Sequence, residues 1–175
     1  EWYENNLAYH IVCLGQNKDL GEMTVALEAL KKVIRKVPDT QKAGMEWLIT
    51  HMPEEDLKTL TGEFLLENCD LAYESWNQAP WKEQISEEVF FDCILPYANI
   101  NERRDNWRGD FRKKFSQIVA GATTPTEATI LLNKNLYDMV DVHYSTERPK
   151  ADQSPYESIE AGMASCTGLS ILLID

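Results

Sequence analysis

Cys166 is the residue whose type and surroundings most clearly suggest chemistry. It follows Ala164 and Ser165 and precedes Thr167 and Gly168, so a small polar turn leads into a short apolar run. If that run is a helix beginning near Ser165, its unpaired backbone N–H groups and its dipole favour the thiolate and can hold an oxyanion. The pattern predicts a nucleophile. The alternative is a small core residue, because free cysteines are commonly buried.

The apolar run after Cys166 must bury most of its surface. Its large residues cover nearly every face of a helix: Leu169, Ile171, Leu172, Leu173 and Ile174. A helix that is apolar all round needs neighbours on every side. We expect a missing neighbour C-terminal to Asp175, in a chain truncated within its catalytic helix, although a strand is the alternative at this length. Self-association through this C-terminal apolar helix is another possibility.

Three histidines are candidates for the base that a thiolate needs. His143 is the nearest to Cys166 in sequence and lies in an irregular polar segment, which is typical of a surface residue. A base must come within hydrogen-bond distance of the thiol, and sequence separation alone does not decide this. His10 and His51 have no acidic or cysteine partner at a readable spacing, so we interpret both as structural or exposed.

Other residues support more than one interpretation. The stretch 103–114 is locally basic, with Trp107 and Phe111 at helical spacing. It is an anion or glycan patch, a solvated face opposite the core, or a set of internal partners for the 29 acidic residues. Trp76 and Trp81 either stack on a sugar or peptide or fill the core, and Glu157 either lines a cleft or caps a helix.

Composition excludes several classes of protein. The 175 residues fit one domain, and the net charge of −12 argues against nucleic-acid binding and against docking on anionic lipid. No apolar run approaches the roughly 20 residues of a membrane span. The cysteines are scattered, without C-x-x-C or Cys/His spacing, and suggest neither structural zinc nor any other cofactor: Cys13, Cys69, Cys93 and Cys166. The acidic residues show no calcium-ligand pattern.

Helical periodicity dominates the chain, so the predicted fold class is mainly α, an irregular multi-helix domain. Amphipathic or capped segments predict helices over 20–37, 42–51, from Pro53, 62–76, 86–94, 105–119, from Thr124, and a short turn from Pro155. Only residues 140–144 show a possible strand alternation.

Two segments resemble a known family. Residues 152–159 and 162–170, around Cys166, resemble the entry to the catalytic helix of transglutaminase-like cysteine enzymes. Residues 95–104 and 106–108 resemble the helical region that precedes this core in large bacterial proteins. The resemblance spans about Glu63 to Asp175, and the first sixty residues match nothing that we can name.

The resemblance implies a fold, a site and a reaction. It implies a helical domain over 1–150 and the start of a transglutaminase-like (papain-like) core over 151–175. Cys166 takes the place of the nucleophile, whereas the His and Asp of the triad would lie beyond Asp175. Thr167 stands where better-known transglutaminases carry an aromatic residue, so substrate preference and protein crosslinking are not carried over.

Two functions follow for the chain as expectations. In the first, the parent protein forms a Cys acyl-enzyme on a peptide or amide substrate, for acyl transfer or hydrolysis, and this chain alone has little activity. The alternative is a non-catalytic helical module that binds a peptide, a glycan or a partner domain. Because Glu1 is not an initiator Met, we expect a processed chain, and an extracytoplasmic bacterial location is favoured.

Overall fold

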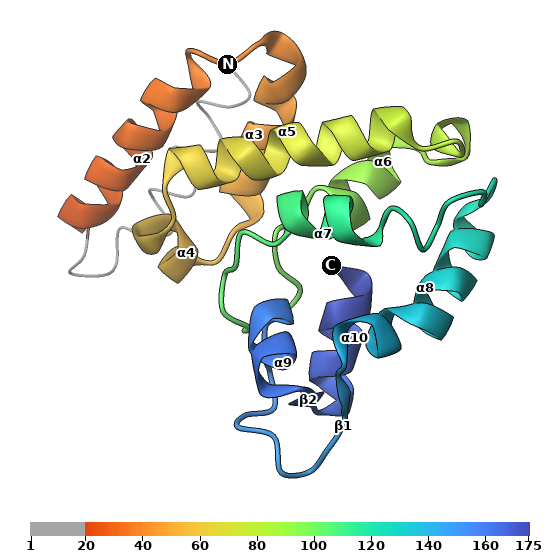
Figure 1. The fold of residues 1–175 in the computed structure, drawn as a ribbon. Coiled ribbons are helices and arrows are strands. Elements are labelled where there is room, and N and C mark those ends of the chain that lie inside the picture. The colour runs from red at the N-terminus through yellow and green to blue at the C-terminus, as the bar shows by residue number, and fades with distance from the viewer. Residues whose placement is uncertain (1–19) are drawn as a thin grey trace.

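The computed structural model describes residues 20–175, and this part of the chain is mainly α-helical, as predicted (Figure 1). The first half contains α2 (Leu20–Ile34), α3 (Asp39–His51), α4 (Glu54–Thr59), α5 (Gly62–Gln78), the 3-10 turn η1 (Lys82–Gln84) and α6 (Glu87–Val89), which continues into the π-helix η2 (Phe90–Ile94). The second half contains α7 (Arg108–Phe115), α8 (Pro125–Val140), β1 (His143–Tyr144), α9 (Pro155–Ala161), β2 (Met163–Ala164) and α10 (Cys166–Ile174).

Local side-chain caps start several of these helices. Thr61, Ser86 and Thr124 each accept a hydrogen bond from the backbone N–H three residues ahead, which satisfies a donor that the first turn leaves free. Ser154 and Glu157 form a reciprocal capping box at the start of α9. The helix starts predicted near residues 62, 86, 124 and 155 are confirmed.

The predicted helix over 105–119 is shorter in the structure. The Asp105 carboxylate accepts hydrogen bonds from Arg103 Nε and Ser154 Oγ, both at 2.6 Å, so Asp105 stays in the loop before α7. At the other end, the Ile118 N–H donates to Phe115 O in a turn three residues long, outside the α-helical pattern. Contacts with α9 and a tighter final turn therefore limit α7 to Arg108–Phe115.

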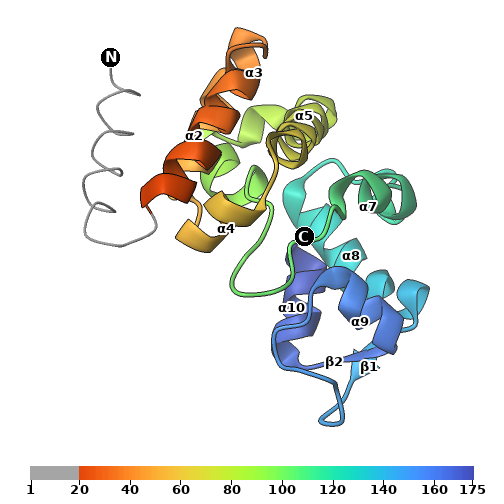
Figure 2. The same ribbon diagram turned by 90° about the vertical axis from the view of Figure 1, so that its left-hand side faces the viewer.

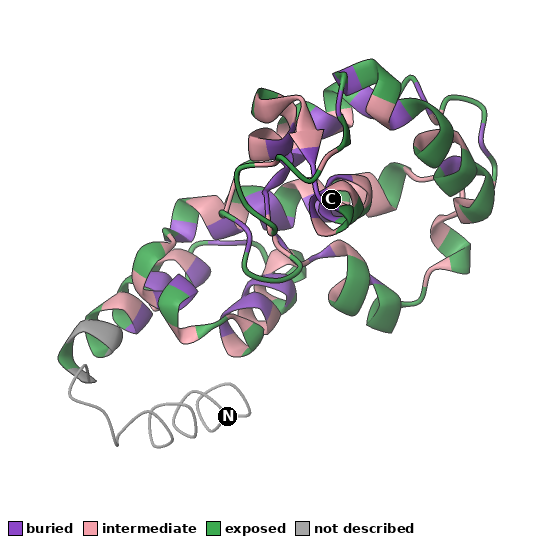
Figure 3. Cartoon of the chain, turned by 90° about the horizontal axis from the view of Figure 1, so that it is seen from below, coloured by how far each residue is buried: buried purple, intermediate pink, exposed green. Residues whose placement is uncertain are grey.

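Among residues 20–175, two hydrophobic clusters form the core. The buried positions are purple in Figure 3. The first lies among α2 to η2 and includes the fully buried Phe90, Met45 and Leu65. The second contains Trp107, Leu136 and other residues of α7, α8, β2 and α10. Residues 151–175 share this second cluster with α7 and α8, and the predicted boundary at residue 150 stays a prediction.

The predicted strand at 140–144 contracts to the two residues of β1. Val140 completes α8, and Asp141 ends that helix in the left-handed region, with φ of 54°. β1 pairs in parallel with β2, with His143 opposite Met163 (Figure 2). This pairing fixes the segment that leads directly into α10. No helix within residues 20–175 has the length and apolar character needed to cross a membrane.

Candidate active site

Cys166 is the first residue of α10 and its side chain is exposed, so its interpretation as a buried core residue is wrong. The helix begins there because Ser165 caps it. The buried Ser165 hydroxyl accepts from Gly168 N at 3.0 Å and donates to Ala151 O at 2.6 Å. By helix geometry, the N–H groups of the first turn before Gly168 have no intrahelical acceptor. The thiol therefore lies at the positive end of a nine-residue helix.

The first turn of α10 packs closely on the strand that precedes it. A Cβ added at Gly168 would lie 3.0 Å from Ala164 Cβ and 3.4 Å from both Gln153 Cβ and Ser158 Oγ. Gly168 thus lets α10 approach β2 and α9. Its small size serves this internal packing, because Gly168 is buried.

Glu157 is a helix-capping residue. Its carboxylate accepts from Ser154 N at 2.9 Å and forms an ion pair with Lys150 at 2.8 Å. The interpretation of Glu157 as a helix cap is therefore confirmed. Trp76 stacks on Phe90 with ring centroids 4.4 Å apart and packs on the first core cluster, which confirms its core interpretation.

Within residues 20–175, no histidine forms a hydrogen bond with Cys166. His143 lies on β1 and is exposed, as expected for a surface residue. Within residues 20–175, neither the His143 ring nor the Cys166 thiol has a hydrogen-bond partner. His51 stacks on Trp47, and its Nδ1 lies 2.7 Å from Trp47 O. His10 lies outside the described residues.

Three of the six basic residues in the stretch 103–114 pair with acidic residues, whereas Lys113 and Lys114 are exposed, as a solvated face predicts. Arg104 Nε lies 2.9 Å from Asp56 Oδ2, and Tyr97 donates to the same carboxylate at 2.9 Å. Arg103 pairs with Asp105, and Arg112 pairs with Glu74. Arg108 is buried, so the interpretation of the stretch as a solvated face is wrong at this position.

A large cleft lies at the opposite end of α10 from Cys166. Its cavity volume is about 950 Å³, and both core clusters contribute to its wall. Ile174 and Asp175 line it, whereas Cys166 does not. Cys166 and Ile174 are eight residues apart in α10, which corresponds to about 12 Å along the helix axis. The candidate nucleophile and the cleft are therefore separate features.

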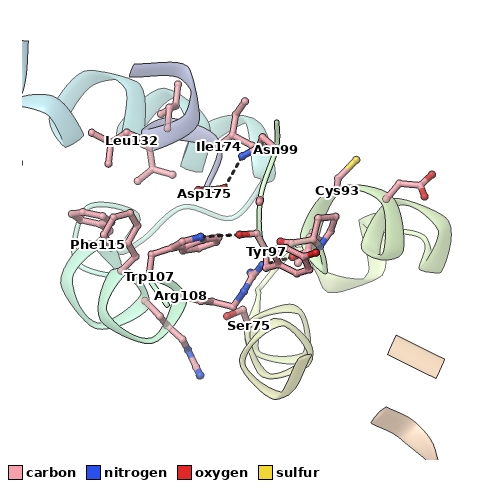
Figure 4. A pocket seen from close by; sticks show the side chains of 18 of the residues that line it. Ser75, Cys93, Tyr97, Asn99, Trp107, Arg108, Phe115, Leu132, Ile174 and Asp175 are labelled. Carbon is pink, nitrogen blue, oxygen red and sulfur yellow. Dashed lines mark hydrogen bonds between the residues drawn. The ribbon is translucent and has the colours of Figure 1, made fainter. Parts of the chain in front are cut away.

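Asp175 lines the cleft, and the pKa of its carboxyl group is raised. Its carboxylate accepts from Asn99 Nδ2 at 2.7 Å (Figure 4). Burial, with the Glu102 carboxylate nearby, raises the pKa of Asp175 to about 7. Within residues 20–175, no group of three or more His, Cys, Asp or Glu side chains is arranged to hold a metal ion.

Comparison with known proteins leaves this site without an assigned family. Neither the protein-family models nor the curated proteins match the sequence, and no solved structure matches the fold.

Proposed function

We propose that Cys166 is the nucleophile of a transglutaminase-like cysteine enzyme, to which this chain contributes the helical region and the start of the catalytic core. The observation that supports this function is the exposed thiol at the capped N-terminus of α10. A thiolate is the reactive form of cysteine, and a helix N-terminus stabilises it through the dipole and free N–H groups.

The proposed reaction uses the thiolate on an amide or acyl carbon. A C–S bond forms, the C–N bond of the amide breaks, and the amine leaves with a proton from a general acid. An amine or water then attacks the thioester and releases the Cys166 thiolate. In this scheme the base and its orienting acid come from the rest of the enzyme, since His143 and Cys166 make no mutual hydrogen bond.

The exposed Cys93 allows an internal comparison of thiol reactivity. Both thiols are exposed, but Cys93 lies near the end of the π-helix η2, whereas Cys166 lies at the N-terminus of α10. Near neutral pH we expect iodoacetamide to alkylate Cys166 about two- to fivefold faster than Cys93, the factor that a helix dipole supplies. Cys93→Ser and Cys166→Ser variants assign the rates, and peptide mass spectrometry measures them.

If the function is acyl transfer, Cys166 should also form a thioester with an acyl donor. Incubation with an activated acyl ester should give a thioester on Cys166, detected by mass as one acyl addition that hydroxylamine removes. Cys93 serves as the control for non-specific acylation. Equal alkylation and equal acylation of the two thiols would contradict the proposed nucleophile.

A further inference from the structure

The cleft contains a buried arginine that has no carboxylate partner. Arg108 is 8% exposed and lines the cleft. Its Nε donates to Asn68 Oδ1 at 2.9 Å, and its Nη2 donates to Ile94 O and Pro96 O, both at 2.8 Å. Among residues 20–175, Nη1 has no hydrogen-bond partner and the guanidinium forms no ion pair.

A buried guanidinium without a counter-ion is electrostatically costly. Removing a charge from water disfavours its ionised form unless a paired charge compensates. Burial lowers the pKa of Arg108 to about 10, although the charge of Asp175 opposes this shift. The Trp107 ring, whose centroid is 4.5 Å from the guanidinium carbon, compensates only in part. The site therefore favours an added anion.

The other arginines of the cleft already have acidic partners. Arg104 pairs with Asp56, and Arg112 pairs with Glu74. Of the arginines in the described part of the wall, Arg108 is the one that forms no ion pair, and the charge of Asp175 offsets its burial only in part. An anionic ligand would therefore be directed to Arg108.

The wall next to Arg108 offers no backbone edge to a peptide. Four consecutive carbonyl groups, of residues 94 to 97, each accept a hydrogen bond from a side chain. Arg108 donates to the carbonyls of 94 and 96, Asn68 donates to that of 95, and Trp107 Nε1 donates to that of 97. Since an extended peptide binds by pairing with free main-chain groups, this wall suits a small molecule better.

Part of the remaining wall is aromatic and aliphatic, and the acidic Asp92 and Asp175 also line the cleft. Trp107, Phe115 and Leu132 lie on one side of the cleft, and Arg108 is close to Trp107 (Figure 4). The volume of about 950 Å³ falls in the range of roughly 300 to 1,000 Å³ that small-molecule sites occupy. The apolar side formed by Trp107, Phe115 and Leu132, together with the Arg108 guanidinium, matches a ligand that has an apolar body and one anionic end.

We infer that this cleft binds a small organic carboxylate, whose apolar body packs on Trp107, Phe115 and Leu132 and whose carboxylate accepts from Arg108. The contact uses Nη1, so the hydrogen bonds of Nε and Nη2 are retained. This site is independent of Cys166 and does not rest on the proposed acyl transfer.

Isothermal titration calorimetry on the full chain tests the site with 4-phenylbutyrate and its neutral amide. We expect the acid to bind about tenfold or more tightly than the amide, because only the acid compensates the charge of Arg108. Arg108→Lys should lower the affinity for the acid toward that for the amide and leave the amide unchanged. Equal affinity of acid and amide, or no heat from either at millimolar concentration, would overturn the inference.

A second pair of variants keeps the test decisive if Arg108→Lys does not fold. Leu132→Trp fills the cleft from α8 and should weaken binding of the acid about tenfold or more. Ile130→Trp makes the same substitution on the same helix at a side chain that is 61% exposed and does not line the cleft. It should leave binding unchanged. If both variants bind the acid equally, the ligand does not occupy this cleft.

Discussion

Replacing Asn68 by leucine should destabilise the fold by breaking the connection between α5 and α7. Asn68 is 4% exposed and uses both ends of its amide. Its Oδ1 accepts from Arg108 Nε at 2.9 Å, and its Nδ2 donates to Leu95 O at 2.7 Å. Leucine has similar volume but neither polar atom, so the buried guanidinium and the carbonyl would both lose a partner.

The size of the effect follows from the two bonds. A hydrogen bond to a charged group contributes about 1.5–3 kcal/mol, and a neutral one about 1 kcal/mol. Because both remaining partners are buried, we expect Asn68→Leu to lower the free energy of unfolding by the sum of the two contributions, about 2.5–4 kcal/mol. Asn135→Leu is the matched control, since Asn135 is exposed and bonds only within α8, to Leu131 O. The control should change stability by less than about 0.5 kcal/mol.

A double-mutant cycle isolates the Asn68–Arg108 bond. Arg108→Met alone should also destabilise, since it leaves Asn68 Oδ1 and two carbonyls without a donor. The double variant should be less destabilised than the sum of the single variants by about 1.5–3 kcal/mol. Urea unfolding followed by circular dichroism measures all four proteins. Additivity within about 0.5 kcal/mol would refute the proposed coupling.

Three further predictions use the same unfolding assay. Ser165→Ala removes the cap of α10 and the bond to Ala151 O, and should cost about 1–2 kcal/mol; an unchanged midpoint would contradict the capping role. Leu136→Ala, at 1% exposure in the second core cluster, should cost about 2–5 kcal/mol, whereas Met139→Ala, at 39% exposure on the same helix, should cost far less. The third concerns pH. Burial raises the pKa of Asp175 to about 7, so the folded state binds this proton more tightly than the unfolded state, and the resulting stability is lost as pH rises through about 7. Asp175→Asn should therefore stabilise the protein at about pH 8, by an amount on the order of 2 kcal/mol, and have little effect at about pH 3; equal effects at both values would contradict the shift.

The local features of this fold follow from the sequence by itself. The caps at Thr124, Ser154 and Ser165 act over three residues, so the starts of α8, α9 and α10 need no distant partner. The apolar period of 3.6 residues likewise predicts α2 and α5 and the mainly α fold class. Cys166 can be singled out as a candidate for the same reason, because its neighbours in sequence create the start of its helix.

Burial and the cleft were decided only by the tertiary structure. Arg108 sits in a basic run that suggests a solvated face, yet its main partner, Asn68, is 40 residues away in sequence. The exposure of Cys166 depends on how α10 packs on β2 and α9, and the cleft is lined by residues from segments between Trp47 and Asp175 that lie far apart in the sequence. Hydrogen-bond capping is a short-range property of the chain. The dielectric surroundings of a charge and the exposure of a thiol depend on distant segments that only the folded chain brings together.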